Sequence, residues 1–114
     1  MSLVYKILRV QEWARMQKDH VFSGSPDDRR DGFIHFSAAA QVRATAEKHF
    51  AGEDVLVVLA VEAEPLGEAL RWEVSRGGQK FPHLYTDLPL AVVISSHEIH
   101  RDADGRFVLP PSIS

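Results

Sequence analysis

The spacing of apolar and polar residues predicts short strands and helices in the first third of the chain. Residues 3–9 (LVYKILR) are mostly apolar and rich in β-forming side chains, which predicts a strand. Residues 11–20 contain no Gly or Pro, and Trp13 and Met16 are three positions apart, so both lie on one face of a predicted helix. Residues 22–32 concentrate Ser, Gly, Pro and Asp and therefore predict an exposed loop.

A strand that leads directly into a helix is predicted for residues 31–42 (DGFIHFSAAAQV). Alternation along FIHFS places Phe33, His35 and Ser37 on one face of the strand. Ser37 occupies the position of a helix N-cap, and the Ala-rich residues after it favour helix. A buried stripe on that helix is predicted from apolar residues spaced by four: Val42, Ala46 and Phe50.

The second half of the chain predicts consecutive strands. Residues 55–61 (VLVVLAV) are an uninterrupted β-branched and aliphatic run, typical of a central strand buried on both faces. Further strands are predicted at 70–75, where Arg71 and Glu73 share a face, and at 90–99.

Residues 81–86 (FPHLYT) predict an edge strand or an extended loop, because Pro82 cannot donate to a sheet ladder. An Asp-Gly turn at 102–105 and a returning strand at 106–109 complete the pattern. Since the helices come early and the later strands are consecutive, we expect an α+β fold and not a doubly wound sheet.

Composition narrows the classes of protein. The 114 residues, 45% hydrophobic and 25% charged, predict a single globular domain over residues 1–114. No apolar run approaches a membrane span and no signal peptide is visible, so a cytoplasmic location is expected. The absence of Cys excludes disulfides and thiolate chemistry, and a net charge of -3 argues against duplex nucleic acid as a partner. The composition does not indicate whether the protein is a monomer or an oligomer.

Two polar motifs are candidates for a site. His35 and Ser37 are neighbours on one strand face and can orient a ligand hydroxyl or amide; alternatively, they are a half-buried histidine and a simple helix cap. In an extended FPHLYT segment, His83 and Tyr85 share a face with Phe81 and form a polar-tipped aromatic wall. Such a wall suits a planar ligand such as nicotinamide or adenine, although an ordinary aromatic sheet edge is the alternative.

Glu73 directly follows Trp72, and a carboxylate in an aromatic setting can have a raised pKa and act as an acid or base. It can also hold a sugar hydroxyl and stabilise positive charge at an anomeric carbon. The alternative is an ion pair with Arg71 or Arg76.

Metal binding is not expected. His97 and His100 in HEIH are three apart and would face opposite sides of a strand, whereas a zinc helix needs a spacing of four. These two histidines, with His20 and His49, are expected at the surface. Neither a nucleophile elbow nor a phosphate-binding loop is present in the sequence.

The combination of GFIHFS, LVVLAVE, LRWE and FPHLYTDLPL resembles the bacterial and plant family catalogued as domain of unknown function 952, over nearly the whole chain. The resemblance implies an ADP-ribosyltransferase-like fold, which also houses RNA 2′-phosphotransferases. That fold is a split, mostly antiparallel β core with two or three helices, and it binds NAD in the cleft between the sheet halves. Its enzymes break the bond between nicotinamide and ribose through an oxocarbenium-like state, with a glutamate on a ribose hydroxyl.

The resemblance also implies positions for the site residues, assigned by chain order. The early-strand position falls on Lys6 or Tyr5, and the middle-strand position on His35 or Ser37. The late glutamate is Glu73 or Glu98, and the sequence does not decide between them.

The resulting hypothesis is a cleft that binds a nucleotide-like (NAD or ADP-ribose) or phosphate-bearing ligand, with NAD as a candidate substrate of ADP-ribosyl- or phosphotransferase-like chemistry. The expected catalytic residues are His35, Glu73 and His83. The expected ligand-binding residues are Lys6, Ser37, Arg71, Arg76 and Tyr85. A non-catalytic binding or interaction module with a decayed transferase site is the alternative, and a metal-dependent hydrolase is a third class.

Overall fold

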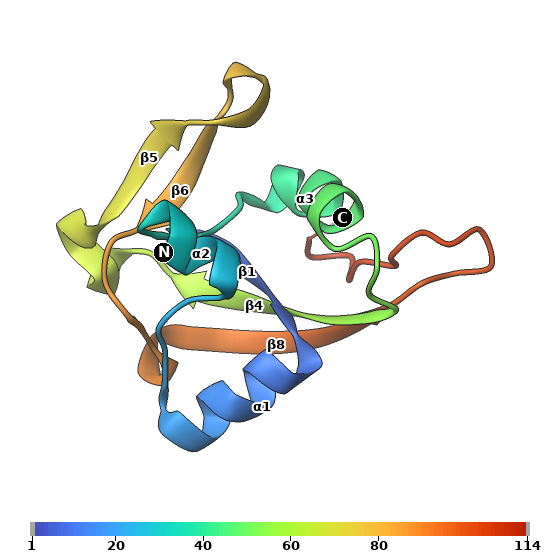
Figure 1. Cartoon of the computed structure of the whole chain (residues 1–114), viewed down its shortest axis with the longest axis horizontal. Helices are drawn as coiled ribbons and strands as arrows, with labels where there is room; N and C mark the ends of the chain where they lie inside the picture. Colours follow the sequence, from blue (N-terminus) through green and yellow to red (C-terminus); the bar gives the residue numbers. More distant parts are fainter. Residues whose placement is uncertain (1, 114) are drawn as a thin grey trace.

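A computed structural model describes residues 2–113 (Figure 1). It has a mixed α+β fold with antiparallel strands, as the order of the sequence patterns predicted. The principal sheet has the strand order β1-β4-β8, formed by Leu3–Arg9, Val55–Glu62 and Val93–His100. The central position and double-sided burial predicted for β4 are confirmed, since its neighbours pair on both edges and side chains from both of its faces are buried.

A second sheet has the order β3-β6-β5, formed by Ile34–His35, Lys80–Leu84 and Leu70–Val74. The prediction that FPHLYT is an edge strand or loop was therefore wrong, because β6 is central. Pro82 is tolerated there because its carbonyl faces β3 and accepts a hydrogen bond from Phe36 N at 2.9 Å. Its ring nitrogen faces the same way and cannot return a hydrogen bond to Phe36, so the ladder between β3 and β6 ends after His35.

Two-residue strands β2 (Val21–Phe22) and β7 (Leu88–Pro89) form a small third sheet. The α-helices are α1 (Val10–Asp19), α2 (Pro26–Asp31) and α3 (Val42–His49). Short 3-10 turns connect other elements: η1 (Ala39–Gln41), η2 (Glu64–Ala69), η3 (Arg76–Gly78) and η4 (Leu90–Val92). No helix within residues 2–113 is long and apolar enough to cross a membrane.

The segment 22–32, predicted as an exposed loop, instead contains α2. Ser25 caps this helix by accepting a hydrogen bond from Asp28 N at 3.2 Å, while the Asp28 side chain accepts one from Ser25 N at 2.9 Å. Pro26 occupies the first helical turn, where its missing N–H costs nothing. This reciprocal capping box fixes a helix too short to be stable on its own.

Ser37 is not the helix N-cap that the sequence predicted. Its backbone forms a bridge with β1, in which Tyr5 N donates to Ser37 O and Ser37 N donates to Tyr5 O, both at 2.8 Å. The Ser37 hydroxyl instead lies 3.2 Å from Thr45 Oγ1 on α3. The two larger sheets thus meet through this bridge and diverge around it, with α2 and α3 on either side (Figure 1).

The remaining patterns agree with the structure in outline. Val42 and Ala46 are fully buried against β1 and β4 and Phe50 packs at the edge of the same cluster, as the spacing of four predicted. The Asp-Gly turn is present, with Gly105 N donating to Asp102 O at 3.0 Å. The returning strand predicted at 106–109 is reduced to a bridge between Phe107 and Arg101.

Candidate ligand-binding cleft

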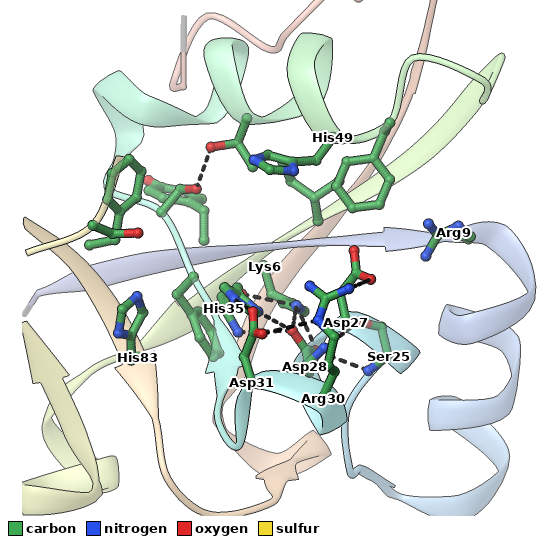
Figure 2. Close-up of a pocket in the computed structure, with 18 residues that line it drawn as sticks. Lys6, Arg9, Ser25, Asp27, Asp28, Arg30, Asp31, His35, His49 and His83 are labelled. Carbon is green, nitrogen blue, oxygen red and sulfur yellow. Dashed lines mark hydrogen bonds and ion pairs between the residues drawn. The ribbon is translucent and has the colours of Figure 1, made fainter. Parts of the chain in front are cut away.

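A cleft of about 240 Å³ opens where the two larger sheets diverge (Figure 2). Its walls come from β1, α2, β3 with the residues after it, α3 and β6. In Figure 2, Lys6, Asp28 and His35 gather on one wall, and His49 lies across from them below α3. The cleft therefore draws together residues that are distant in the sequence.

Asp28 is the centre of the polar wall. Its carboxylate is 3% exposed and lies 3.1 Å from the ammonium of Lys6. It also accepts hydrogen bonds from the His35 backbone N at 3.1 Å and contacts His35 Nδ1 at 2.6 Å. Lys6 Nζ donates to both oxygens of Asp28, at 3.1 and 3.3 Å, and to the His35 carbonyl at 2.9 Å. Lys6 and Asp28, both buried, and the partly exposed His35 thus form one network that ties α2 to β1 and β3.

The ionisation of this network follows from its burial and its charges. Burial by itself favours the neutral form of Asp28, but the hydrogen bond from His35 and the charge of Lys6 outweigh it, so the pKa of Asp28 is lowered strongly. Burial lowers the pKa of Lys6, which the charge of Asp28 only partly offsets. The hydrogen bonds of Lys6 Nζ to Asp28 and to the His35 carbonyl engage this side chain within the protein.

His35 lies between two carboxylates. Its Nδ1 lies 2.6 Å from Asp28 Oδ1, and its Nε2 lies 2.9 Å from Asp31 Oδ2. Carboxylates only accept hydrogen bonds, so both contacts are satisfied at once only when both ring nitrogens carry protons. His35 is thus a clamped ring on the wall, oriented from both sides by α2.

His83 lies opposite His35 in the β3–β6 ladder and is held by a residue of β5, whereas His35 is held by α2. Its Nδ1 lies 2.9 Å from Glu73 Oε1, and the same oxygen accepts a hydrogen bond from Tyr85 OH at 2.6 Å. His83 is buried and lines the cleft, whereas Glu73 lies behind it on β5. With Nδ1 on Glu73, Nε2 is the ring nitrogen that can meet a ligand.

The expectation of a raised pKa for Glu73 was wrong. The hydrogen bonds from Tyr85 and then from His83 lower the pKa of Glu73, against the opposing effect of burial. In turn, the hydrogen bond to Glu73 raises the pKa of Tyr85. Glu73 is therefore an ionised anchor for its two partners.

Phe33 joins the two histidines. Its ring stacks on His83 with centroids 3.9 Å apart and packs against His35 at 4.7 Å and Tyr85 at 5.5 Å. The rings of His35 and His83 are themselves 5.9 Å apart, edge to face. This cluster fixes the spacing of the two histidines, although one of them is bonded to α2 and the other to β5.

The structure brings together part of the residue set predicted for the site. Lys6, His35, Ser37 and His83 line the cleft. The other described members do not line it: Glu73, Arg71 and Tyr85 lie on β5 and at the end of β6, with the Arg71 guanidinium 4.8 Å from the centre of the Tyr85 ring. The side chain of Arg76 lies outside the described part of the structure.

Of the alternative residues that the sequence left open for the site, one lines the cleft and another lies away from it. Tyr5 lines the cleft together with Lys6. Glu98 does not line it, and its carboxylate contacts His100 at 2.9 Å on an exposed part of β8. His49, expected only as a surface residue, is exposed and also lines the cleft.

Sequence reasoning missed the acidic residues of α2, above all Asp28 and Asp31. A signal for the helix was present, because Ser25, Pro26 and Asp28 have the spacing of a capping box with Pro in the first turn. Nothing local indicated that Asp28 would be buried against Lys6, which is 22 positions away. Across residues 2–113, no group of three or more His, Asp or Glu side chains is arranged to hold a metal ion.

Comparisons with known proteins found one matching protein family and solved structures of a similar protein. The model of a family described as a protein of unknown function (DUF952) matches residues 7–96. The crystal structure of protein CC0527 from Caulobacter crescentus is 51% identical, with a TM-score of 0.89 over 95% of each chain. The solution NMR structure of CC0527 is 52% identical, with a TM-score of 0.82 over 93% of this chain and 91% of that one. No curated protein matches the chain.

Proposed function

The chain belongs to the DUF952 family of proteins of unknown function, and we propose that its cleft binds a nucleotide-like small molecule of the NAD or ADP-ribose class. The observation that carries the proposal is the pairing of His35 and His83 on one wall of the cleft, each ring held by carboxylates. The His83 ring, fixed through Nδ1, presents Nε2 to a ligand without losing side-chain entropy on binding, whereas His35, bonded at both nitrogens, shapes the wall beside it.

The size of the cleft favours one half of a dinucleotide as its occupant. A volume of about 240 Å³ is slightly below the range of drug-sized pockets, so the enclosed part fits a nucleoside or ribosyl group. Arg9 and Arg30 also line the cleft, and Arg30 is mostly exposed. We propose that a phosphate of the ligand lies towards these two cations, because their ion pairs with Glu53 and Asp27 are partly or largely exposed, whereas the Lys6–Asp28 pair is buried.

The fold that we propose for this activity is ADP-ribosyltransferase-like. Two features support it: the β core is split into two sheets, and the cleft lies where the sheets diverge. In the proposed arrangement, His83 Nε2 contacts a ligand hydroxyl, and Glu73 is a positioning residue that holds Nδ1. A ribose hydroxyl held directly by Glu73 is not part of the proposal, because Glu73 does not line the cleft.

Calorimetric titration of the full chain with NAD, ADP-ribose and inorganic phosphate tests the binding proposal. Binding of NAD or ADP-ribose by the wild-type protein is expected, with affinity reduced about tenfold or more in His83→Ala, which loses a ligand contact. His100→Ala is the matched control, because His100 is also bonded to a glutamate but lies outside the cleft. No heat with either nucleotide, or equal losses in both variants, would contradict the proposal.

A non-catalytic binding module is the second candidate. It is favoured by the saturation of Lys6 and His35 with internal partners, which leaves fewer groups to act on a substrate. Incubation with NAD, followed by chromatography of released nicotinamide, separates the two functions. Release that is lost in His83→Ala supports a transferase or hydrolase, whereas nucleotide binding without release supports the module.

A further inference from the structure

The outer edge of β5 has no strand beside it within the described residues. β5 is the last strand in the order β3-β6-β5, and it pairs with β6 along its inner edge. Figure 1 shows the β5–β6 hairpin extending away from the other elements, with β5 on its outer side. An edge of this kind presents unpaired backbone groups to another strand.

The hydrogen-bonding pattern shows which groups face outwards. Ala69 O accepts from Tyr85 N and Ser75 N donates to Gln79 O, so the odd-numbered residues of this strand bond towards β6. The alternating residues, Leu70, Trp72 and Val74, therefore turn their N–H and C=O groups to the outer edge. Within the described part of the chain, the Leu70 N–H is already used, because it donates to Gly67 O.

The side chains at this edge are unusually apolar for an exposed strand. Trp72 is 48% exposed and Val74 is 66% exposed, and alternation places both on one face of β5. The opposite face carries Arg71 and Glu73, which have opposite charges. In the order Leu, Arg, Trp, Glu, Val, the apolar residues are placed symmetrically about Trp72, and the two residues that flank it carry opposite charges.

We propose that β5 pairs with β5 of a second copy of this chain, antiparallel and about a two-fold axis at Trp72. Trp72 then faces Trp72 of the second copy, and the two exchange a pair of backbone hydrogen bonds. Val74 N–H donates to Leu70 O of the second copy, and the two-fold axis repeats this bond from Val74 of the second copy to Leu70 of the first. The result is a continuous six-stranded sheet.

The charges select this register over its neighbours. With Trp72 opposite itself, Arg71 faces Glu73 of the second copy on both sides of the axis. A shift of two residues in one direction places Arg71 opposite Arg71, and a shift in the other places Glu73 opposite Glu73. Like charges directly opposite are destabilising, so both shifted pairings are disfavoured.

Sedimentation velocity of the full chain from micromolar to millimolar concentration tests the pairing. A concentration-dependent dimer is expected, and Arg71→Glu or Glu73→Arg alone should raise its dissociation constant about tenfold. The double variant Arg71→Glu/Glu73→Arg exchanges the charges symmetrically and should restore the dimer. Circular dichroism confirms that each variant is folded.

Val74→Lys and Val108→Lys form a matched pair of controls, since Val108 is 56% exposed but lies outside β5. Only Val74→Lys should weaken the dimer. The proposal is overturned by a wild-type protein that stays monomeric throughout. It is equally overturned by a dimer that Val74→Lys does not weaken, or by a double charge exchange without recovery.

Discussion

Nδ1 of His35 lies 2.6 Å from Oδ1 of Asp28, a carboxylate that is almost completely buried. The same carboxylate neutralises Lys6 and closes the capping box of α2. One side chain thus orients a candidate ligand-binding ring and also holds a helix against the principal sheet. Stability and site geometry are coupled through Asp28.

Asp28→Asn should lower the free energy of unfolding by about 3–5 kcal/mol, because it leaves the buried Lys6 ammonium without its counter-ion. Urea unfolding followed by circular dichroism measures the loss. Asp27→Asn is the control on the same helix, because Asp27 is exposed and paired with Arg30, and a change below about 1 kcal/mol is expected. Equal losses in the two variants would contradict the role assigned to Asp28.

The contribution of Asp28 should disappear in acid. Its folded-state pKa is lowered from 3.8, so the unfolded state takes up the proton first, and the stabilisation is complete above the unfolded pKa. As pH falls below 3.8 and towards the lower folded pKa, that stabilisation is lost progressively. Urea midpoints of the wild-type protein and Asp28→Asn should therefore converge between neutral pH and strong acid. A constant difference across this range would refute the assignment.

Tyr85 should ionise above its ordinary pKa of 10.0, because the hydrogen bond to Glu73 stabilises the neutral phenol. Glu73→Gln should lower the pKa of Tyr85, as measured by absorbance near 295 nm with Tyr85→Phe as the subtraction. Glu98→Gln removes an exposed carboxylate that contacts His100 and should leave the titration unchanged. A Tyr85 titration that ignores Glu73→Gln would mean that the contact is absent in solution.

Phe33→Leu should destabilise the protein by about 1–2 kcal/mol, because stacking with His83 and edge contacts with His35 and Tyr85 are lost. The more specific readout is nuclear magnetic resonance. The His83 ring protons should lose the ring-current shift that Phe33 imposes at a centroid distance of 3.9 Å, while those of His100 stay unchanged. An unaltered His83 spectrum would exclude the stack.

The elements that could be predicted are those whose pattern is repeated along the chain. β4 followed from an unbroken apolar run, and the buried face of α3 followed from Val42 and Ala46 at a spacing of four. α2 was missed because its polar composition resembles a loop, and only the capping residues distinguish it. The central position of β6 could not be found locally, since the tolerance of Pro82 depends on where β3 ends.

In the candidate site too, the residues marked by a local pattern were predictable and their distant partners were not. His35 and His83 were identified by alternation within single segments, and the structure places them opposite each other in one ladder. Their carboxylate partners were harder to assign. Asp28 contacts Lys6 across 22 positions, and Glu73 turned out to reach the cleft only through His83. Contacts of that range depend on the tertiary fold, which no local pattern encodes.

The bridge between Tyr5 and Ser37 consists of two backbone hydrogen bonds at the junction of the two larger sheets. The same two sheets share the core that joins Val4 and Leu59 to Leu84, so the two bridge amides become free to exchange only when that shared core opens. Amide hydrogen exchange at Tyr5 and Ser37 would therefore report how often the molecule opens at this line. Any molecule that spans the two walls would slow exchange at these two amides before it slowed exchange within β4.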